Sequence, residues 1–283
     1  MVGAAERCEA DRVRASTALA LVRACHPEPT VAVTAVAAGL AISVGRPAWG
    51  VVLVAAAVFT GQLSVGWLND YLDADRDRTV GRADKPLAVG AVSRRAVGVG
   101  ITCAAALCVP LSLSTGWLPG AVHLLAVASA WSYDAWLKST VASVVPYAVS
   151  FGLLPVFVVL SGEVAPAWWL VAAGALLGAG AHFANVLPDL ADDAVTGVRG
   201  LPQRLGPRSA AVAVVLLLAS MACLAFGPVG GPAWTGLWAL GLAVAAVVAS
   251  VVWGRGDRSR GLFRAVMVTA LLAVGLLLVS PLG

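Results

Sequence analysis

The chain has 283 residues, of which 60% are hydrophobic and only 12% are charged, and its mean hydropathy is +0.89. A soluble domain carries about 25% charged residues, so a single water-soluble core is excluded and the lipid bilayer is the expected surrounding. The net charge of +4 comes with no basic stripe that contains aromatic residues, so the sequence predicts no nucleic-acid partner. The five cysteines are scattered without a CxxC pair, which indicates neither a disulfide framework nor a zinc site.

Residues 1–15 are charged and lack an apolar stretch, so they are not a cleavable signal peptide. After them come long, continuous apolar windows of the length that spans a bilayer as a helix, rather than the alternating pattern of a barrel. We therefore predict an all-α membrane protein with one domain over 1–283 and nine transmembrane helices. The predicted spans are 29–45, 48–68, 94–115, 118–136, 141–161, 166–186, 209–228, 232–253 and 261–281.

The basic residues predict the orientation of these spans. With the N-terminus in the cytoplasm, the segment before the first span and every loop after an even-numbered span are cytoplasmic. These segments, with the helix ends next to them, hold all of the 19 Lys and Arg except Arg46. Cytoplasmic loops carry the excess of Lys and Arg in membrane proteins. We expect an integral cell-membrane protein with a cytoplasmic N-terminus and with cytoplasmic loops after the second and sixth spans.

These two loops carry one repeated pattern. It reads N-x3-D-x3-D-x3-G-x4-P-x3-G, and each member of the second copy lies 116 residues after its partner in the first. Four predicted spans separate the copies, so both face the same side. The pattern indicates two pseudo-repeated halves in parallel orientation, with a site between them. Its members are Asn69, Asp73, Asp77, Gly81, Pro86 and Gly90 in the first copy, and Asn185, Asp189, Asp193, Gly197, Pro202 and Gly206 in the second.

Helical geometry gathers the acidic residues of each copy on one face. A helix advances about 100° per residue, so Asp70 and both motif aspartates of the first copy lie within one sector of about 100° from Asn69. Asp75 points away from that sector. The second copy repeats the arrangement, with a kink expected at Pro188.

Carboxylates packed this closely repel one another, and a divalent cation removes the repulsion. Mg²⁺ prefers oxygen ligands and commonly completes its shell with water and substrate phosphates. The two clusters therefore predict a magnesium site for a diphosphate at the membrane surface. The candidate ligands are Asn69, Asp70, Asp73, Asp77, Asn185, Asp189 and Asp193, and Asp192 and His182 share the face of the second copy.

Basic side chains near these motifs are candidates for binding phosphate oxygens. Two simpler interpretations stay open: acidic loops at helix ends can be solvated linkers, and the basic residues can serve only to set the topology. The candidates are Arg78, Arg82, Lys85, Lys138, Arg199 and Arg204.

The nine-helix layout and the two motifs resemble the UbiA superfamily of intramembrane prenyltransferases. The motifs are N-D-x-x-D-x-x-x-D at Asn69–Asp77 and D-x-x-x-D at Asp189–Asp193, and the flanking segments DKPL at 84–87 and NVLPDLADDAVTGVRGLPQRLG at 185–206 agree. The resemblance implies nine helices around a central cavity, with Mg²⁺ and an isoprenyl diphosphate held between the halves. It makes Lys138 a diphosphate-binding residue, and Tyr133 lies close to the place of a family tyrosine.

The resemblance implies a Mg²⁺-dependent transfer of an isoprenyl group from an allylic diphosphate to a lipid-phase or aromatic acceptor, through a carbocation. The implied catalytic residues are Asp73, Asp77, Asp189, Asp193 and Tyr133. One alternative is a terpene cyclase of the same type, in which the cation attacks its own chain. A second is an ion transporter or channel, although its charges are expected near the bilayer midplane. The sequence leaves the prenyl length, the acceptor and the oligomeric state open.

Overall fold

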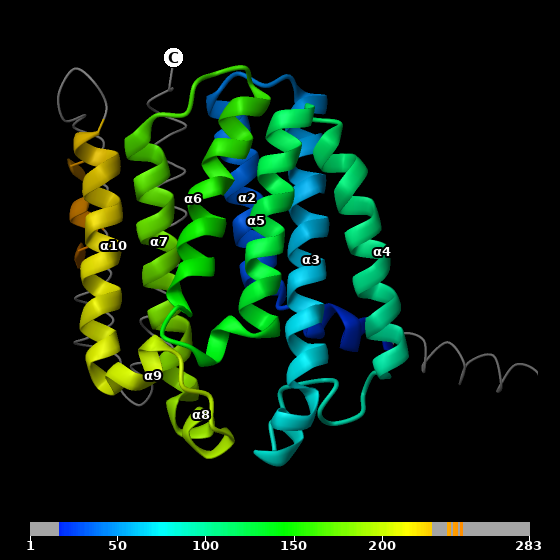
Figure 1. The fold of residues 1–283 in the computed structure, drawn as a ribbon. Coiled ribbons are helices and arrows are strands. Elements are labelled where there is room, and N and C mark those ends of the chain that lie inside the picture. The colour runs from blue at the N-terminus through cyan, green and yellow to red at the C-terminus, as the bar shows by residue number, and fades with distance from the viewer. Residues whose placement is uncertain (1–16, 228–236, 239, 243, 246–283) are drawn as a thin grey trace, which may run out of the picture.

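The structure is a computed structural model that describes residues 17–227, 237, 238, 240–242, 244 and 245. Every regular element in these residues is a helix, and they contain no strand. The long helices lie side by side along one common direction (Figure 1). The prediction of an all-α chain is therefore confirmed for the described part.

Seven long helices coincide with the first seven predicted spans. The eighth and ninth predicted spans, 232–253 and 261–281, lie almost entirely outside the described residues, as does the segment 1–15. Short elements join the long ones: η1 (Leu137–Ser139), η2 (Leu187–Asp189), α8 (Leu190–Thr196), α9 (Leu201–Leu205) and η3 (Gly206–Arg208). The long helices are α2 (Pro27–Ser43), α3 (Ala48–Thr79), α4 (Arg94–Leu113), α5 (Trp117–Ala135), α6 (Val144–Ser161), α7 (Trp168–Val186) and α10 (Ser209–Phe226).

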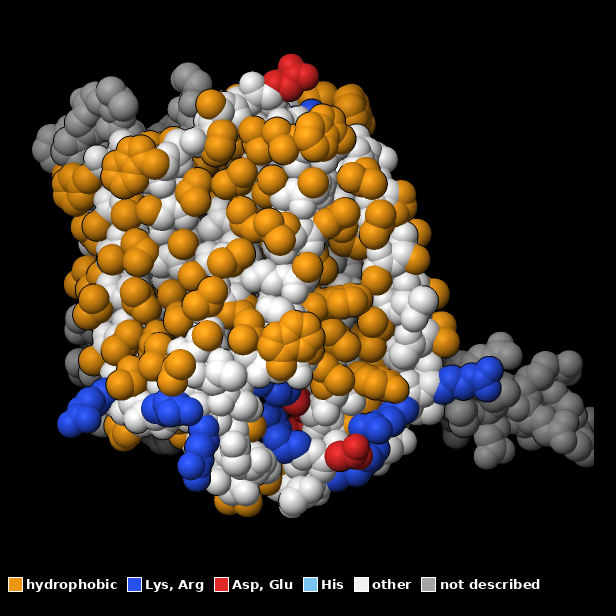
Figure 2. Space-filling view, in the orientation of Figure 1, with side chains coloured by type: hydrophobic (Ala, Val, Ile, Leu, Met, Phe, Trp, Pro, Cys, Tyr) orange, Lys and Arg blue, Asp and Glu red, His pale blue; other side chains and the backbone are white. Residues whose placement is uncertain are grey.

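Five helical stretches of the described chain are long and apolar enough to cross a membrane. On the face shown in Figure 2, hydrophobic side chains cover much of the bundle, while most Lys and Arg lie at its lower edge. Helix α2 is apolar but shorter, at 17 residues. The five stretches are Ala48–Thr79, Arg94–Leu113, Val144–Ser161, Trp168–Thr196 and Leu201–Phe226.

The buried core lies between helices α2, α3, α6, α7 and α10. Val54 and Val58 of α3 meet Phe157 of α6 and Met221 of α10 in one apolar cluster. The backbones of α6 and α7 lie in close contact. A Cβ at Gly178 of α7 would lie 2.5 Å from the carbonyl oxygen of Tyr147. Small residues allow helix backbones to approach in this way inside membranes.

We predict that Gly178→Ala destabilises the protein, because the added methyl group overlaps backbone and side-chain atoms of α6. Overpacking of this kind costs about 1–3 kcal/mol, so the thermal unfolding midpoint in detergent should fall. Gly98→Ala is the matched control, since a Cβ there meets only Tyr71 Cε2 at 3.8 Å. An unchanged midpoint for Gly178→Ala would contradict the close α6–α7 contact.

Candidate active site

The first motif lies on α3, which continues as one helix to Thr79. Because the helix is unbroken, the predicted face forms: Asp70, Asp73 and Asp77 are all buried. Asp75 points away, with 71% of its side chain exposed, and pairs with Arg78 and Arg94. The predicted face of the first copy is confirmed.

The second motif lies beyond a break in its helix. Helix α7 ends at Val186, the 3₁₀ turn η2 contains Pro188, and α8 then begins at Leu190. A proline removes a backbone donor and crowds the preceding turn, so the predicted kink occurs where the sequence places it. The repeated glycines have positive φ in both copies: Gly81 and Gly197 have φ of 72° and 78°, and Gly90 and Gly206 have φ of 75° and 57°.

The two motifs converge through basic side chains of the first half. Arg82 donates to Asp189 Oδ1 at 2.9 Å across 107 residues of sequence. Arg76 lies 3.0 Å from Asp73 Oδ2 and 3.8 Å from Asp193 Oδ1, so its guanidinium lies between the copies. The C-terminal end of α3 and the segment around α8 both lie at the lower end of the bundle (Figure 1).

Further contacts fix the acidic side chains of both copies. Asn69 donates to Asp134 Oδ1 at 3.0 Å, which links α3 to α5. Lys138, just beyond α5, donates to Asp73 Oδ1. Gln203 donates to Asp193 Oδ2 at 2.8 Å. In the described residues no three His, Cys, Asp or Glu side chains are gathered as a metal-binding group, and these contacts show that the carboxylates face cations and amides instead.

Asp70 belongs to a separate cluster. Its Oδ1 accepts from Lys85 at 2.7 Å and lies 3.1 Å from His26 Nε2. Asp70 does not line the cavity described below, whereas His26 and Lys85 do. His26 has φ 54° and ψ 70°, a left-handed conformation that costs a non-glycine residue free energy. Asp70 therefore holds two side chains at the cavity wall.

Arg82 also organises the loop after α3. Its Nε and Nη2 donate to the two carboxylate oxygens of Asp84, each at 2.9 Å. This bidentate contact holds the pKa of Asp84 down at about 2. Because the same guanidinium reaches Asp189, the loop is tied to the second motif.

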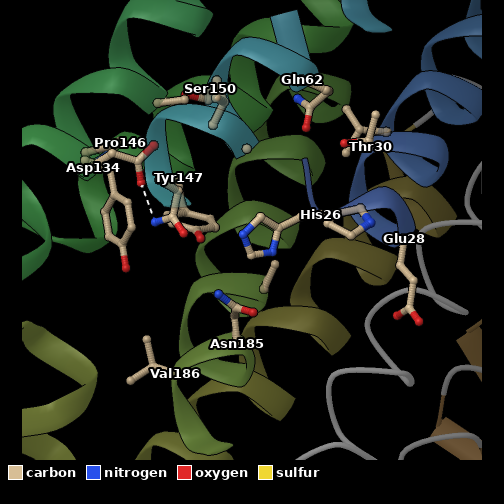
Figure 3. Close-up of a pocket in the computed structure, with 18 of the residues that line it drawn as sticks. His26, Glu28, Thr30, Gln62, Asp134, Pro146, Tyr147, Ser150, Asn185 and Val186 are labelled. Carbon is tan, nitrogen blue, oxygen red and sulfur yellow. Dashed lines mark hydrogen bonds between the residues drawn. The ribbon is translucent and has the colours of Figure 1, made fainter. Parts of the chain in front are cut away.

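A cavity of about 1200 Å³ opens from the acidic end into the bundle. Its charged end contains Asp73, Arg76 and Lys138, and its deeper wall is largely apolar, with Leu40 and Leu154 among its residues. Figure 3 shows how His26, Tyr147 and Asn185 face the same space from different elements. The cavity thus joins a charged end to an apolar interior.

The structure brings most of the predicted site residues to this cavity. Asp77 is buried, with its Oδ1 at 3.6 Å from Arg76 Nη2. Like Asp70, it does not line the cavity. Arg78 pairs with Asp75, and Arg199 and Arg204 line a smaller hollow beside α8. The predicted residues that line the cavity are Asn69, Asp73, Arg82, Lys85, Tyr133, Lys138, Asn185, Asp189 and Asp193.

The sequence reasoning missed four residues of the site. Arg76 had a signal, because it lies seven residues after Asn69, about −20° around the helix, and so on the acidic face. His26, Asp134 and Gln203 carry no such signal, since tertiary contacts alone bring them to Asp70, Asn69 and Asp193.

Comparison with known proteins decides the family. The model of the UbiA prenyltransferase family matches residues 30–274. The chain belongs to this family. The UbiA resemblance seen in the sequence is thereby confirmed, and with its apolar helices the chain is an integral membrane protein. None of the curated proteins compared matches it.

Solved structures share the UbiA fold at low sequence identity. An apo UbiA homolog from Aeropyrum pernix K1 is 20% identical, with a TM-score of 0.73, covering 89% of this chain and 98% of that one. An Archaeoglobus fulgidus homolog bound to GPP and Mg²⁺ is 16% identical, with a TM-score of 0.70 and coverages of 91% and 99%. A digeranylgeranylglyceryl phosphate synthase is 15% identical, with a TM-score of 0.67 and coverages of 93% and 98%.

Ser143 ties the second motif of this UbiA protein to the bundle. Its buried hydroxyl oxygen lies 3.0 Å from His182 Nε2 and accepts from the backbone N–H of Leu201 at 2.9 Å. One hydroxyl thus joins the segment before α6 to α7 and to the start of α9.

We predict that Ser143→Ala loosens the segment that carries the second motif. The Leu201 N–H loses its acceptor, and a buried donor left unpaired costs about 1–3 kcal/mol. Hydrogen exchange measured by mass spectrometry should become faster in peptides from 196–208. Ser132→Ala is the control, because that hydroxyl donates only to Ser129 O of its own helix. Equal exchange in both variants would contradict the assigned role of Ser143.

Proposed function

We propose that the protein transfers an isoprenyl group from an allylic prenyl diphosphate to a second substrate held in the membrane, with Mg²⁺ as cofactor. One observation carries the proposal: Arg82 and Arg76 join two repeated acidic motifs at the charged end of a largely apolar cavity. A prenyl diphosphate has the matching form, a charged head on a hydrocarbon tail.

The donor set fits Mg²⁺. Carboxylate and amide oxygens are among its preferred protein ligands, and Asn69, Asp73, Asn185, Asp189 and Asp193 bring such groups to the charged end of the cavity. The Archaeoglobus fulgidus homolog has been solved with GPP and Mg²⁺ and with DMAPP and Mg²⁺. For Asp70 we propose a positioning role, since its Oδ1 contacts Lys85 and His26 and its side chain does not line the cavity. The proposed metal ligands are Asn69, Asp73, Asp77, Asn185, Asp189 and Asp193.

The remaining residues divide the chemistry between head and tail. Mg²⁺, when bound, neutralises the charge that develops on the diphosphate leaving group. Lys138, Lys85 and Arg82 line the charged end and provide donors for phosphate oxygens. Tyr133 and Tyr147 pack edge to face, with ring centroids 5.0 Å apart, on the cavity wall. Aromatic faces attract a cation in a desolvated site, and the apolar lining keeps water from it.

The orientation belongs to the same proposal. The motifs and most of the surface Lys and Arg seen in Figure 2 lie at one end of the bundle, and the positive-inside rule puts that end in the cytoplasm. Prenyl diphosphates are water-soluble at the head, so a cytoplasmic opening gives them access.

A terpene cyclase is the second candidate. Two hydroxyls of the cavity are already used within the protein: Thr30 donates to Cys25 O at 2.9 Å and Ser150 donates to Ala126 O at 2.8 Å. This leaves fewer donors for a polar acceptor and favours a reaction in which one chain folds on itself. The transporter interpretation is set aside, because the chain belongs to a prenyltransferase family.

We predict that Asp73→Asn reduces Mg²⁺-dependent consumption of geranylgeranyl diphosphate by at least about a hundredfold, as expected for loss of electrostatic stabilisation of a leaving group. Asp189→Asn should behave alike. Asp75→Asn is the matched control, because this carboxylate lies on the same helix but faces away from the cavity. Diphosphate release from purified protein measures the effect, and full activity of Asp73→Asn would refute the site.

We predict that the wild-type protein, given a prenyl diphosphate and Mg²⁺ without acceptor, forms no cyclic product and turns over only when an aromatic or lipid acceptor is added. Mass spectrometry of the products distinguishes the candidates. A cyclised hydrocarbon or terpene alcohol from the prenyl diphosphate alone would replace the transferase proposal with the cyclase.

A further inference from the structure

Arg76 is the cation at the centre of the acidic cluster. Its Nη2 lies 3.0 Å from Asp73 Oδ2 and 3.6 Å from Asp77 Oδ1, while Nη1 lies 3.8 Å from Asp193 Oδ1. Its side chain is 27% exposed and lines the cavity. One guanidinium thus faces carboxylates from both copies of the repeat.

The repeat itself sets Arg76 apart. The position 116 residues further on holds Asp192, so the second copy has a negative charge where the first has a positive one. Asp192 does not join Arg76; its Oδ2 lies 4.0 Å from Arg82. The symmetry of the two copies is therefore broken at the residue that lies between them.

Two cations form ion pairs with three carboxylates at this point. In the described residues Arg76 and Lys138 are the cations within ion-pair distance of Asp73, Asp77 and Asp193, while Lys85 and Arg82 act on Asp77 from further away. Gln203 contributes an amide to Asp193 but no charge. A divalent ion carries twice the charge of a guanidinium, and its attraction to several carboxylates in a half-buried site is correspondingly stronger.

We propose that Arg76 is an exchangeable counter-ion. It holds the two acidic motifs together while the site is without metal, leaves the carboxylates when a divalent cation binds, and then donates to the diphosphate. This inference rests on the proposed function and names a further diphosphate-binding residue for it.

The proposed exchange has a physical reason in the metal-free protein and another in the protein with metal and diphosphate bound. A ligand that must displace a bound group has its affinity reduced by the fraction of sites that are free, so Arg76 weakens the binding of metal alone. The planar guanidinium makes paired hydrogen bonds to phosphate as readily as to carboxylate. Arg76 therefore opposes metal binding in the absence of substrate and supports diphosphate binding in its presence.

The first measurement uses the metal alone. Mn²⁺ binding to the full-length protein in detergent is followed by the electron paramagnetic resonance signal of free Mn²⁺. We expect Arg76→Gln to bind Mn²⁺ about tenfold more tightly than the wild type, because the competing cation is gone. Arg94→Gln is the matched control: it removes the same charge, but Arg94 bonds to the outward-facing Asp75 at 2.8 Å. Its Mn²⁺ affinity should change less than twofold.

The second measurement uses inorganic diphosphate at a fixed, saturating Mg²⁺ concentration, followed by calorimetry. Here Arg76→Gln should bind about tenfold more weakly, whereas Arg94→Gln should match the wild type. Opposite changes in the two affinities are the signature of exchange, because a merely distorted site would weaken both.

The outcomes are decisive in each direction. Unchanged or weaker Mn²⁺ binding by Arg76→Gln overturns the proposal, as does an equal gain in Arg94→Gln or an unchanged diphosphate affinity. Should Arg76→Gln unfold, Arg76→Lys keeps a shorter cation in place, and its Mn²⁺ affinity should lie above that of the wild type. Asp73→Asn distinguishes failure of the exchange proposal from failure of the proposed function. If Asp73→Asn binds Mn²⁺ more weakly while Arg76→Gln shows no gain in affinity, only the exchange proposal fails. If Asp73→Asn binds Mn²⁺ as the wild type does, the proposed function fails as well.

Discussion

The arrangement of this protein depends on mutual repulsion among carboxylates at one end of a lipid-embedded bundle. Buried acids cannot remain close to one another unless positive charge is brought to them. The structure supplies that charge from Arg76, Arg82, Lys85 and Lys138. Arg76 and Arg82 belong to the first copy of the repeat but contact acids of the second. Electrostatic attraction across the repeat thus holds the two motifs together at the charged end of the cavity.

The apolar part of the cavity complements this charged end. Helices α6 and α7 approach closely at Gly178, and Ser143 ties α7 to the segment that carries the second motif. These contacts fix the distance between the charged end and the wall that would surround a hydrocarbon chain. The same bundle therefore excludes water from the tail and presents polar groups to the head, which is the combination that an ionising allylic substrate requires.

Much of this could be predicted from the sequence, for identifiable reasons. Apolar length predicted the seven long helices of the described residues, and the repeated motifs at Asn69 and Asn185 indicated the family. The helical angle of 100° per residue separated Asp75 from its neighbours and, applied to every residue rather than to acids alone, would have found Arg76 as well. His26 and Gln203 were out of reach, because nothing in their local sequence says which distant carboxylate they meet. Arg78 was placed at the diphosphate on proximity in sequence, whereas in the structure Asp75 binds it at the surface.

The two copies differ in one mechanical respect. Helix α3 is a single rod of 32 residues from the far side of the bundle to its acids, whereas the corresponding acids after α7 follow a proline-containing turn. Asp73 therefore lies on the same continuous helix as the buried part of α3, whereas α7 reaches the second motif through the turn at Pro188 and through the contacts of Ser143 with His182 and Leu201. The position of the first motif is therefore set by one continuous helix, and that of the second is set by a turn and a few side-chain contacts.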